Sequence, residues 1–198
     1  MSTARLEAFS DGVMAVAITL LVLNIAIPGT RHPLPHELGQ QWPAYAAYTV
    51  SFITIGIIWI NHHISLGRLA RPDHSILMLN LLLLMTVVVI PFGTSLLAHY
   101  LRAGQGEHLA AGIYGGILLA MAVAFTALNA QILLRRPELL TTPLAPEVRR
   151  RIFLRSFSGV FPYVVATALA VVSPYATLGL SAALAAFYAL PFAGGIVE

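Results

Sequence analysis

The chain has 198 residues, of which 58% are hydrophobic and 10% charged, and its mean hydropathy is +0.82. Soluble domains are typically about 45–50% apolar and about 25% charged, so this composition excludes a water-soluble monomer. The net charge of +3, from 11 basic and 8 acidic residues, is too small and too scattered for a nucleic-acid-binding protein. The lack of cysteine excludes disulfides, thiolate metal sites and cysteine catalysis.

Apolar stretches divide the chain into six candidate membrane helices. They cover residues 9–27, 44–66, 76–97, 109–134, 156–172 and 175–197. Each is long enough to cross a hydrocarbon layer about 30 Å thick, the fifth only just. Because lipid offers the backbone no hydrogen-bond partners, these segments are expected to be helices. The predicted fold class is therefore an all-α polytopic membrane protein with one six-helix domain over residues 1–198.

The arginines, which are the only basic residues apart from histidine, set the expected orientation. With the N- and C-termini both cytoplasmic, the outer side carries Arg31 and Arg102. The cytoplasmic side then carries Arg5, Arg68, Arg71, Arg135, Arg136, Arg149, Arg150, Arg151 and Arg155. This bias favours that orientation and an even number of helices. The basic loop expected over residues 135–155 serves topology and contact with anionic lipid, and a specific lipid site there is the less favoured interpretation.

The first predicted helix holds a carboxylate, Asp11, inside its apolar run. A carboxylate within the membrane costs about 2.5–3.5 kcal/mol, so it needs partners or water. Successive side chains on a helix are about 100° apart, so this helix divides into two sides. One is a stripe about 80° wide, and the other is a polar side that carries Glu7, Ser10, Asp11 and Asn24. The stripe consists of Arg5, Phe9, Gly12, Val16, Thr19, Leu23 and Ile27.

The second predicted helix ends in an unusual polar group, Trp59-Ile60-Asn61-His62-His63. Adjacent histidines on a helix point about 100° apart and cannot serve one metal from the same face, so no metal site is expected. Either His62 or His63 could bond Asp11, because both helix ends lie on the cytoplasmic side. Asn80 in the third helix is a similar buried polar group.

The segment Arg5-Leu6-Glu7-Ala8-Phe9-Ser10-Asp11 resembles the R-x-x-x-F-S-D signature of the lysosomal potassium-channel family called transmembrane protein 175. The polar group at residues 59–63 and Asn80, followed by four leucines, also resemble that family. The resemblance covers the whole chain as a single six-helix repeat, as in prokaryotic members. It implies a homotetramer in the cell membrane, a central pore lined by the first helix, and a potassium-permeable cation channel. It implies no cofactor other than the permeant potassium ion.

The resemblance also implies roles for individual residues. Family positions that face the pore correspond to Val16, Thr19 and Leu23, and all three fall on the stripe found from helix angles. The implied network that holds the first helix contains Arg5, Phe9, Ser10, Asp11, Asn80 and one of His62 or His63. Relatives often have Ile or Leu where this chain has Val16, so the constriction is expected at Val16 or at Leu23. Thr19 either ligates the ion or bonds back to its own helix.

Apolar rings in a pore gate by dewetting and make an ion shed part of its hydration shell, which favours potassium over sodium moderately. The alternative is a proton-coupled secondary transporter that uses Asp11 and a second-helix histidine as a relay. An enzyme is not expected, because Ser10 and Asp11 diverge by about 100° and cannot form a linear triad with a histidine. The segment 112–116 resembles a potassium-channel filter only in its Tyr-Gly pair, and Gly112 and Gly116 are expected to serve close helix packing instead.

Overall fold

The computed structural model describes residues 2–30 and 32–189. Apart from one isolated β-bridge between Leu69 and Leu140, the described secondary structure is helical. Its elements are α1 (Thr3–Leu20), the 3-10 turn η1 (Leu21–Asn24), α2 (Leu34–Gly39), α3 (Trp42–Gly67), α4 (His74–Ala103), α5 (Glu107–Ala130), the π-helical turn η2 (Gln131–Arg135), the 3-10 turn η3 (Pro137–Leu139), α6 (Pro146–Ser158), α7 (Val160–Leu169) and α8 (Pro174–Ala189).

Five helical segments are long and apolar enough to cross a membrane. They are Thr3–Asn24, Trp42–Gly67, His74–Ala103, Glu107–Arg135 and Pro146–Leu169. Each contains most of one of the first five predicted spans. The sixth predicted span, 175–197, begins as α8, which is described for 16 residues, and its last residues lie outside the described part of the chain.

Three helix boundaries differ clearly from the sequence expectation, one of them the end of α4 at Ala103 instead of residue 97. The first helix begins at Thr3 instead of residue 9, because the polar residues before the apolar run also adopt helix. The expected loop over 135–155 is wrong, since its second half is the helix α6, which starts at Pro146. Proline at the first helical position and Glu147 in the first turn are strong helix-start signals. An apolar run marks the membrane-buried part of a helix and not the whole helix.

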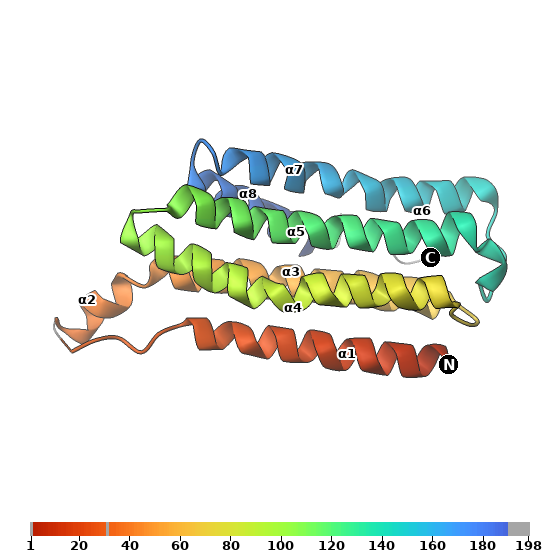
Figure 1. Ribbon diagram of the computed structural model, residues 1–198, viewed down its shortest axis with the longest axis horizontal. Helices are drawn as coiled ribbons and strands as arrows, with labels where there is room; N and C mark the ends of the chain where they lie inside the picture. The colour runs from red at the N-terminus through yellow and green to blue at the C-terminus, as the bar shows by residue number, and fades with distance from the viewer. Residues whose placement is uncertain (1, 31, 190–198) are drawn as a thin grey trace.

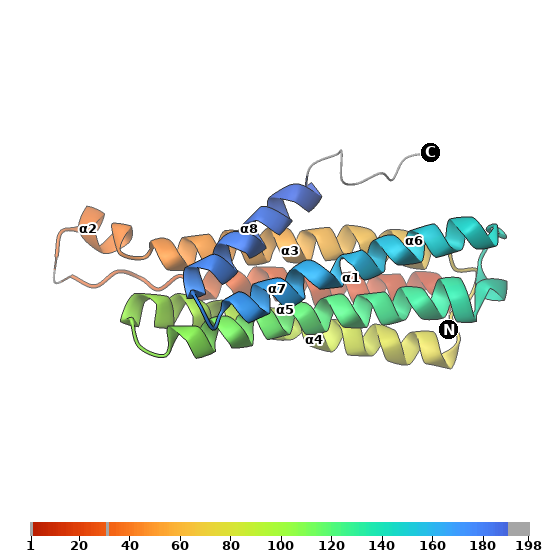
Figure 2. The same cartoon turned by 90° about the horizontal axis from the view of Figure 1, so that it is seen from above.

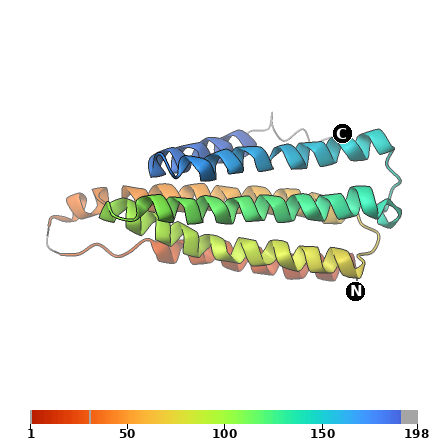
Figure 3. The same cartoon turned by 45° about the horizontal axis from the view of Figure 1, so that its top comes forward.

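The helices form a layered bundle with α1 at one edge (Figure 1). α1 packs on α3 and α4, α4 packs extensively on α5, and α5 packs on α7. Figure 3 shows the same order from another side, with α6 and α7 at the edge opposite α1. The edge position leaves much of the surface of α1 uncovered within one chain.

The close approach of α5 to α7 depends on Gly115. A Cβ at this position would lie 2.9 Å from Thr167 Oγ1 and 3.0 Å from Thr167 Cα. The expectation that Gly112 and Gly116 serve close packing is wrong, because a Cβ at Gly116 would meet nothing within 4 Å and one at Gly112 only the Ala170 Cβ at 3.9 Å. The face of α5 toward α7 is centred on Gly115, between the two.

Successive long helices run in opposite directions, so the loops gather at two ends (Figure 2). The start of α1, the α3–α4 loop and the start of α6 share one end. The short helix α2, the α4–α5 turn and the α7–α8 turn share the other. The nine arginines expected in the cytoplasm therefore lie toward the first end, whereas Arg102 lies at the second.

Candidate functional site: the first helix and its anchors

One face of α1 and η1 is buried and the other is uncovered. The buried face consists of Leu6, Ser10, Met14, Ala17 and Leu21, each at most 2% exposed. The opposite face presents Phe9 at 52%, Val16 at 57% and Leu23 at 74% exposure, together with exposed Gly12 and Thr19. The three predicted pore residues, Val16, Thr19 and Leu23, thus lie on the surface that the chain's own helices leave open, and so does Phe9 of the predicted network.

The hydroxyl of Thr19 donates a hydrogen bond to the carbonyl oxygen of Val16 at 2.8 Å. This is the bond to its own helix that the sequence offered as one of two alternatives. The two alternatives are compatible. A hydroxyl that gives its proton to the backbone keeps its oxygen lone pairs available to a cation.

The buried face of α1 carries a polar cluster formed by Ser10, His62 and Asn80. The Asn80 amide nitrogen donates to Ser10 Oγ at 3.0 Å, and His62 Nε2 lies 2.6 Å from Asn80 Oδ1. Because Oδ1 is an acceptor, His62 carries its proton on Nε2. The Ser10 hydroxyl donates in turn to the Leu6 carbonyl at 2.9 Å. The cluster joins α1, α3 and α4, and all three side chains are at most 1% exposed.

Asp11 has a different partner from the one expected. Trp59 Nε1 donates to Asp11 Oδ1 at 2.8 Å, so the predicted bond between Asp11 and a histidine is wrong. His62 is committed to Asn80, and exposed His63 stacks on the Trp59 ring with centroids 6.3 Å apart. Trp59 and His63 are four residues apart on α3 and share a face. In the sequence Trp59 is only one member of a polar group, and nothing there indicates that its indole N–H reaches the carboxylate of Asp11.

Arg5 does not join this network within the chain. It is exposed, and the ion pairs of the described residues involve Arg102 and Arg136 instead. The expected contact of Arg5 with Ser10, Asp11 and a histidine is therefore absent within the described part of one chain. Phe9 likewise lies on the uncovered face.

The C-terminal end of the first helix is fixed by a second polar contact. Asn24, the last residue of η1, donates from its side-chain amide to the Pro91 carbonyl oxygen at 2.9 Å. Pro91 lies inside α4. The polar side predicted for the first helix contained Asn24, but its partner depends on how α4 packs and has no signal in the sequence.

A second buried polar cluster ties α3, α4 and α5 together. Ser51 Oγ lies 2.7 Å from Thr94 Oγ1 and 3.0 Å from the Tyr114 hydroxyl. All three residues are buried. The sequence carries no signal for this cluster, because isolated Ser, Thr and Tyr residues are common in membrane helices.

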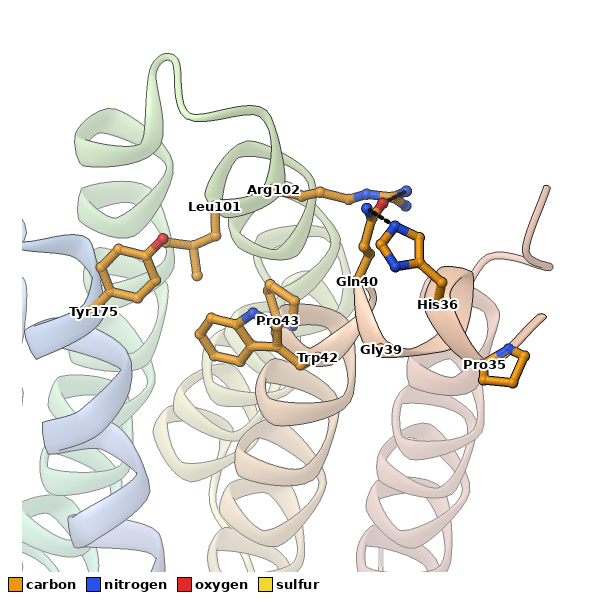
Figure 4. A pocket seen from close by; sticks show the side chains of 9 residues that line it. All are labelled: Pro35, His36, Gly39, Gln40, Trp42, Pro43, Leu101, Arg102 and Tyr175. Carbon is orange, nitrogen blue, oxygen red and sulfur yellow. Dashed lines mark hydrogen bonds between the residues drawn. The ribbon is translucent and has the colours of Figure 1, made fainter. Parts of the chain in front are cut away.

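A groove of about 680 Å³ lies at the end of the bundle that carries α2, lined by α2 and by the ends of α3, α4 and α8 (Figure 4). Trp42 stacks on Tyr175 with ring centroids 6.0 Å apart. Arg102 on the other side lies 3.4 Å from Gln40 Oε1 and 4.0 Å from Glu37 Oε2. No α1 residue lines the groove, so it is separate from the predicted pore stripe. Among residues 2–30 and 32–189, no three His, Cys, Asp or Glu side chains gather to hold a metal ion.

Several apolar helices long enough to span a bilayer, with the first one held by buried polar contacts, define the chain as a helical membrane protein. The family described as "Endosomal/lysosomal potassium channel TMEM175" matches residues 5–91. A potassium channel of Streptomyces collinus is 44% identical over 188 residues, which cover 94% of this chain and 91% of that protein. The chain therefore belongs to the TMEM175 family.

Two further comparisons agree with this family assignment. A potassium channel of Chamaesiphon minutus is 40% identical over 198 residues, covering 95% of this chain and 94% of that protein. The crystal structure of a lysosomal potassium-selective channel TMEM175 homolog from the same organism matches with a TM-score of 0.84 and 38% identity, covering 94% of this chain and 96% of that one. These relatives are named as channels and not as enzymes.

Proposed function

We propose that the chain forms a homotetrameric, potassium-permeable cation channel with a hydrophobic constriction on its first helix. One observation carries the proposal. Val16, Thr19 and Leu23, which match the pore positions of the family, lie on the face of α1 and η1 that the chain itself leaves uncovered. If the uncovered face of α1 only contacted lipid, it would have no reason to contain the three pore positions of the family.

The position of α1 at the edge of the bundle suits a central pore. Four copies arranged about an axis can bring their first helices together while α3 to α8 surround them (Figure 1). Exposed Arg5 and Phe9 would then contact the adjacent copies, which explains why neither is engaged within one chain. We assign the assembly to a prokaryotic cell membrane, with the arginine-rich end in the cytoplasm.

Two apolar rings would narrow this pore. Val16 and Leu23 are seven residues apart, about 10 Å along a helix axis. Rings of these side chains exclude water and force an ion to lose part of its hydration shell, which costs potassium less than sodium. Between them, four Thr19 hydroxyls with their protons on the Val16 carbonyls would offer lone pairs to the dehydrated ion. Because the pore offers the ion few ligands in place of the lost water, we expect only moderate selectivity for potassium over sodium.

The buried contacts of α1 then have a structural role. The bonds of Ser10 to Asn80, of Asn80 to His62 and of Trp59 to Asp11 hold the pore helix against α3 and α4. The transporter alternative needs Asp11 and a histidine in one relay, but Asp11 bonds Trp59 while His62 bonds Asn80. This separation favours the channel.

The test is ion flux into liposomes that hold the purified protein. We expect passive, non-saturating potassium flux down an imposed gradient, faster than sodium flux. Val16→Asn or Leu23→Asn should raise the flux by wetting the constriction. Val164→Asn is the matched control, because Val164 is 45% exposed on α7 at the opposite edge. Unchanged flux in both pore variants would remove the first helix from the pathway, and saturating countertransport would favour the carrier.

A further inference from the structure

The helix α6 is unusual because none of its residues is buried although it continues into a membrane span. It carries four arginines in seven positions: Arg149, Arg150, Arg151 and Arg155. The ion pairs among the described residues involve none of these four. A concentration of guanidinium groups without acidic partners needs an external anion or water.

The four arginines are not equivalent. Arg149 is half-buried and donates from Nη1 to the Leu133 carbonyl at 3.0 Å, so it serves the packing of α6 on η2. Arg150, Arg151 and Arg155 are exposed. Arg150 and Arg151 form the arginine patch of α6, whereas Arg155, five residues after Arg150, points about 140° away from it around the helix. Glu147, exposed in the first turn of α6, is the one acidic residue of this helix.

The arginine patch continues directly into an apolar row. Leu154 and Phe157 on α6 are 48% and 56% exposed, and Phe161 at the start of α7 is 71% exposed. Their spacing of three and four residues places them on one side of the continuous span Pro146–Leu169. Arg150 lies one turn before Leu154 on that same face. A guanidinium followed along the helix by exposed apolar side chains matches the order of a phospholipid, a charged headgroup followed by acyl chains.

The arginine patch also lies where it can meet the headgroups of anionic lipids. α6 and α7 occupy the edge of the bundle opposite α1 (Figure 3). If α1 lines a central pore, α6 lies at the perimeter of the assembly, so this step rests on the proposed function. The patch is at the end of the bundle that carries nine of the 11 arginines, the expected cytoplasmic side, where anionic lipids attract basic segments.

We propose that α6 binds the phosphate-bearing headgroup of an anionic phospholipid in the cytoplasmic leaflet through Arg150 and Arg151. Guanidinium groups bind phosphate oxygens with two parallel hydrogen bonds, which an ammonium cannot do. All 11 of the residues counted as Lys or Arg in this chain are arginine. The apolar row of Leu154, Phe157 and Phe161 holds the acyl chains of the same lipid and distinguishes it from free phosphate.

The experiment compares lipid affinities of the intact protein by native mass spectrometry, with phosphatidylglycerol and phosphatidylcholine as probes. Arg150→Gln with Arg151→Gln removes two charges from the patch. The matched control is Arg71→Gln with Arg135→Gln, which removes two exposed charges from the same end of the bundle. Lipid counting needs no ion flux, so a failure here is distinct from a failure of the channel proposal. Elution as the wild-type assembly shows that each variant is folded.

We expect the preference for phosphatidylglycerol to fall about fivefold per arginine removed from α6, and to stay within about twofold in the control. Arg150→Lys with Arg151→Lys keeps the charge but loses the paired hydrogen bonds, and should recover only part of the preference. An equal loss in the α6 and control pairs, or no loss in either, would overturn the proposal. Displacement of the lipid by millimolar inorganic phosphate would reassign the patch to a free anion.

Discussion

Asn80 offers the sharpest test of how the first helix is held. Its amide nitrogen donates to Ser10 on α1, and its carbonyl oxygen accepts from His62 on α3. Substituting Asn80→Ala removes both interhelical bonds and leaves the His62 Nε2 proton buried without an acceptor. All three residues are fully or almost fully buried, so no bulk water can replace the lost partner.

The magnitude follows from these contacts. Interhelical hydrogen bonds between membrane helices contribute about 0.6 kcal/mol on average and up to about 1.7 kcal/mol. A buried donor left unpaired costs about 1–3 kcal/mol more. We therefore expect Asn80→Ala to lower the free energy of unfolding by about 2–4 kcal/mol. Ser10→Ala should cost about 2–3 kcal/mol, because one interhelical bond is lost and the buried Asn80 amide donor is left without an acceptor, while the bond of Asn80 with His62 remains.

The assay is a double-mutant cycle of Ser10→Ala and Asn80→Ala on the purified protein, with thermal unfolding and the yield of the assembled form as readouts. We expect a coupling energy of about 0.6–1.7 kcal/mol between the two sites. Asn61→Ala is the control, since the Asn61 amide bonds only its own helix, at the Ile57 carbonyl. A coupling below about 0.3 kcal/mol, the level of independent sites, would refute the cluster as an anchor.

Substitutions at two further positions separate the anchoring of α1 from ion selection. Asp11→Ala should lower the yield of assembled protein several-fold, whereas Asp11→Asn keeps an acceptor for the Trp59 indole and should lower the yield much less. The potassium-to-sodium flux ratio should be unchanged in both variants. Normal assembly with lost selectivity in Asp11→Ala would contradict this prediction. Thr19→Ala should reduce that flux ratio while leaving assembly intact, and Thr19→Ser, which retains the hydroxyl, should preserve it. An unaffected ratio in liposomes holding Thr19→Ala would exclude the hydroxyl as an ion ligand.

The membrane-spanning parts of the fold could be predicted because hydropathy reports directly on them. The start of α6 does not follow from hydropathy, because its helix-start signals, Pro146 and Glu147, lie inside a polar segment. The same limit applies to the first helix, whose polar opening turn from Thr3 precedes the apolar stretch. Hydropathy predicts which residues lie in the lipid layer, and local helix signals predict where each helix begins.

The uncovered face of α1 could also be predicted, because the angles within one helix follow from residue spacing alone. The partners of its polar side could not. Whether Asp11 meets Trp59, His62 or His63 depends on the rotation of α3 about its own axis, which spacing within α1 does not report. The structure resolves this by burying His62 beside Asn80 and turning Trp59 toward the carboxylate.

The two sets of polar contacts also explain how the register of the first helix is specified. Lipid gives apolar helices no preference for one rotation, so polar bonds and close packing must set it. Ser10 and Asp11 hold α1 near its start, and Asn24 holds the end of η1 at Pro91. A slip of one residue would turn the helix by about 100° and move Val16 off the uncovered face. Because such a slip breaks every one of these bonds, the anchors at the two ends determine which side chains the stripe between them presents.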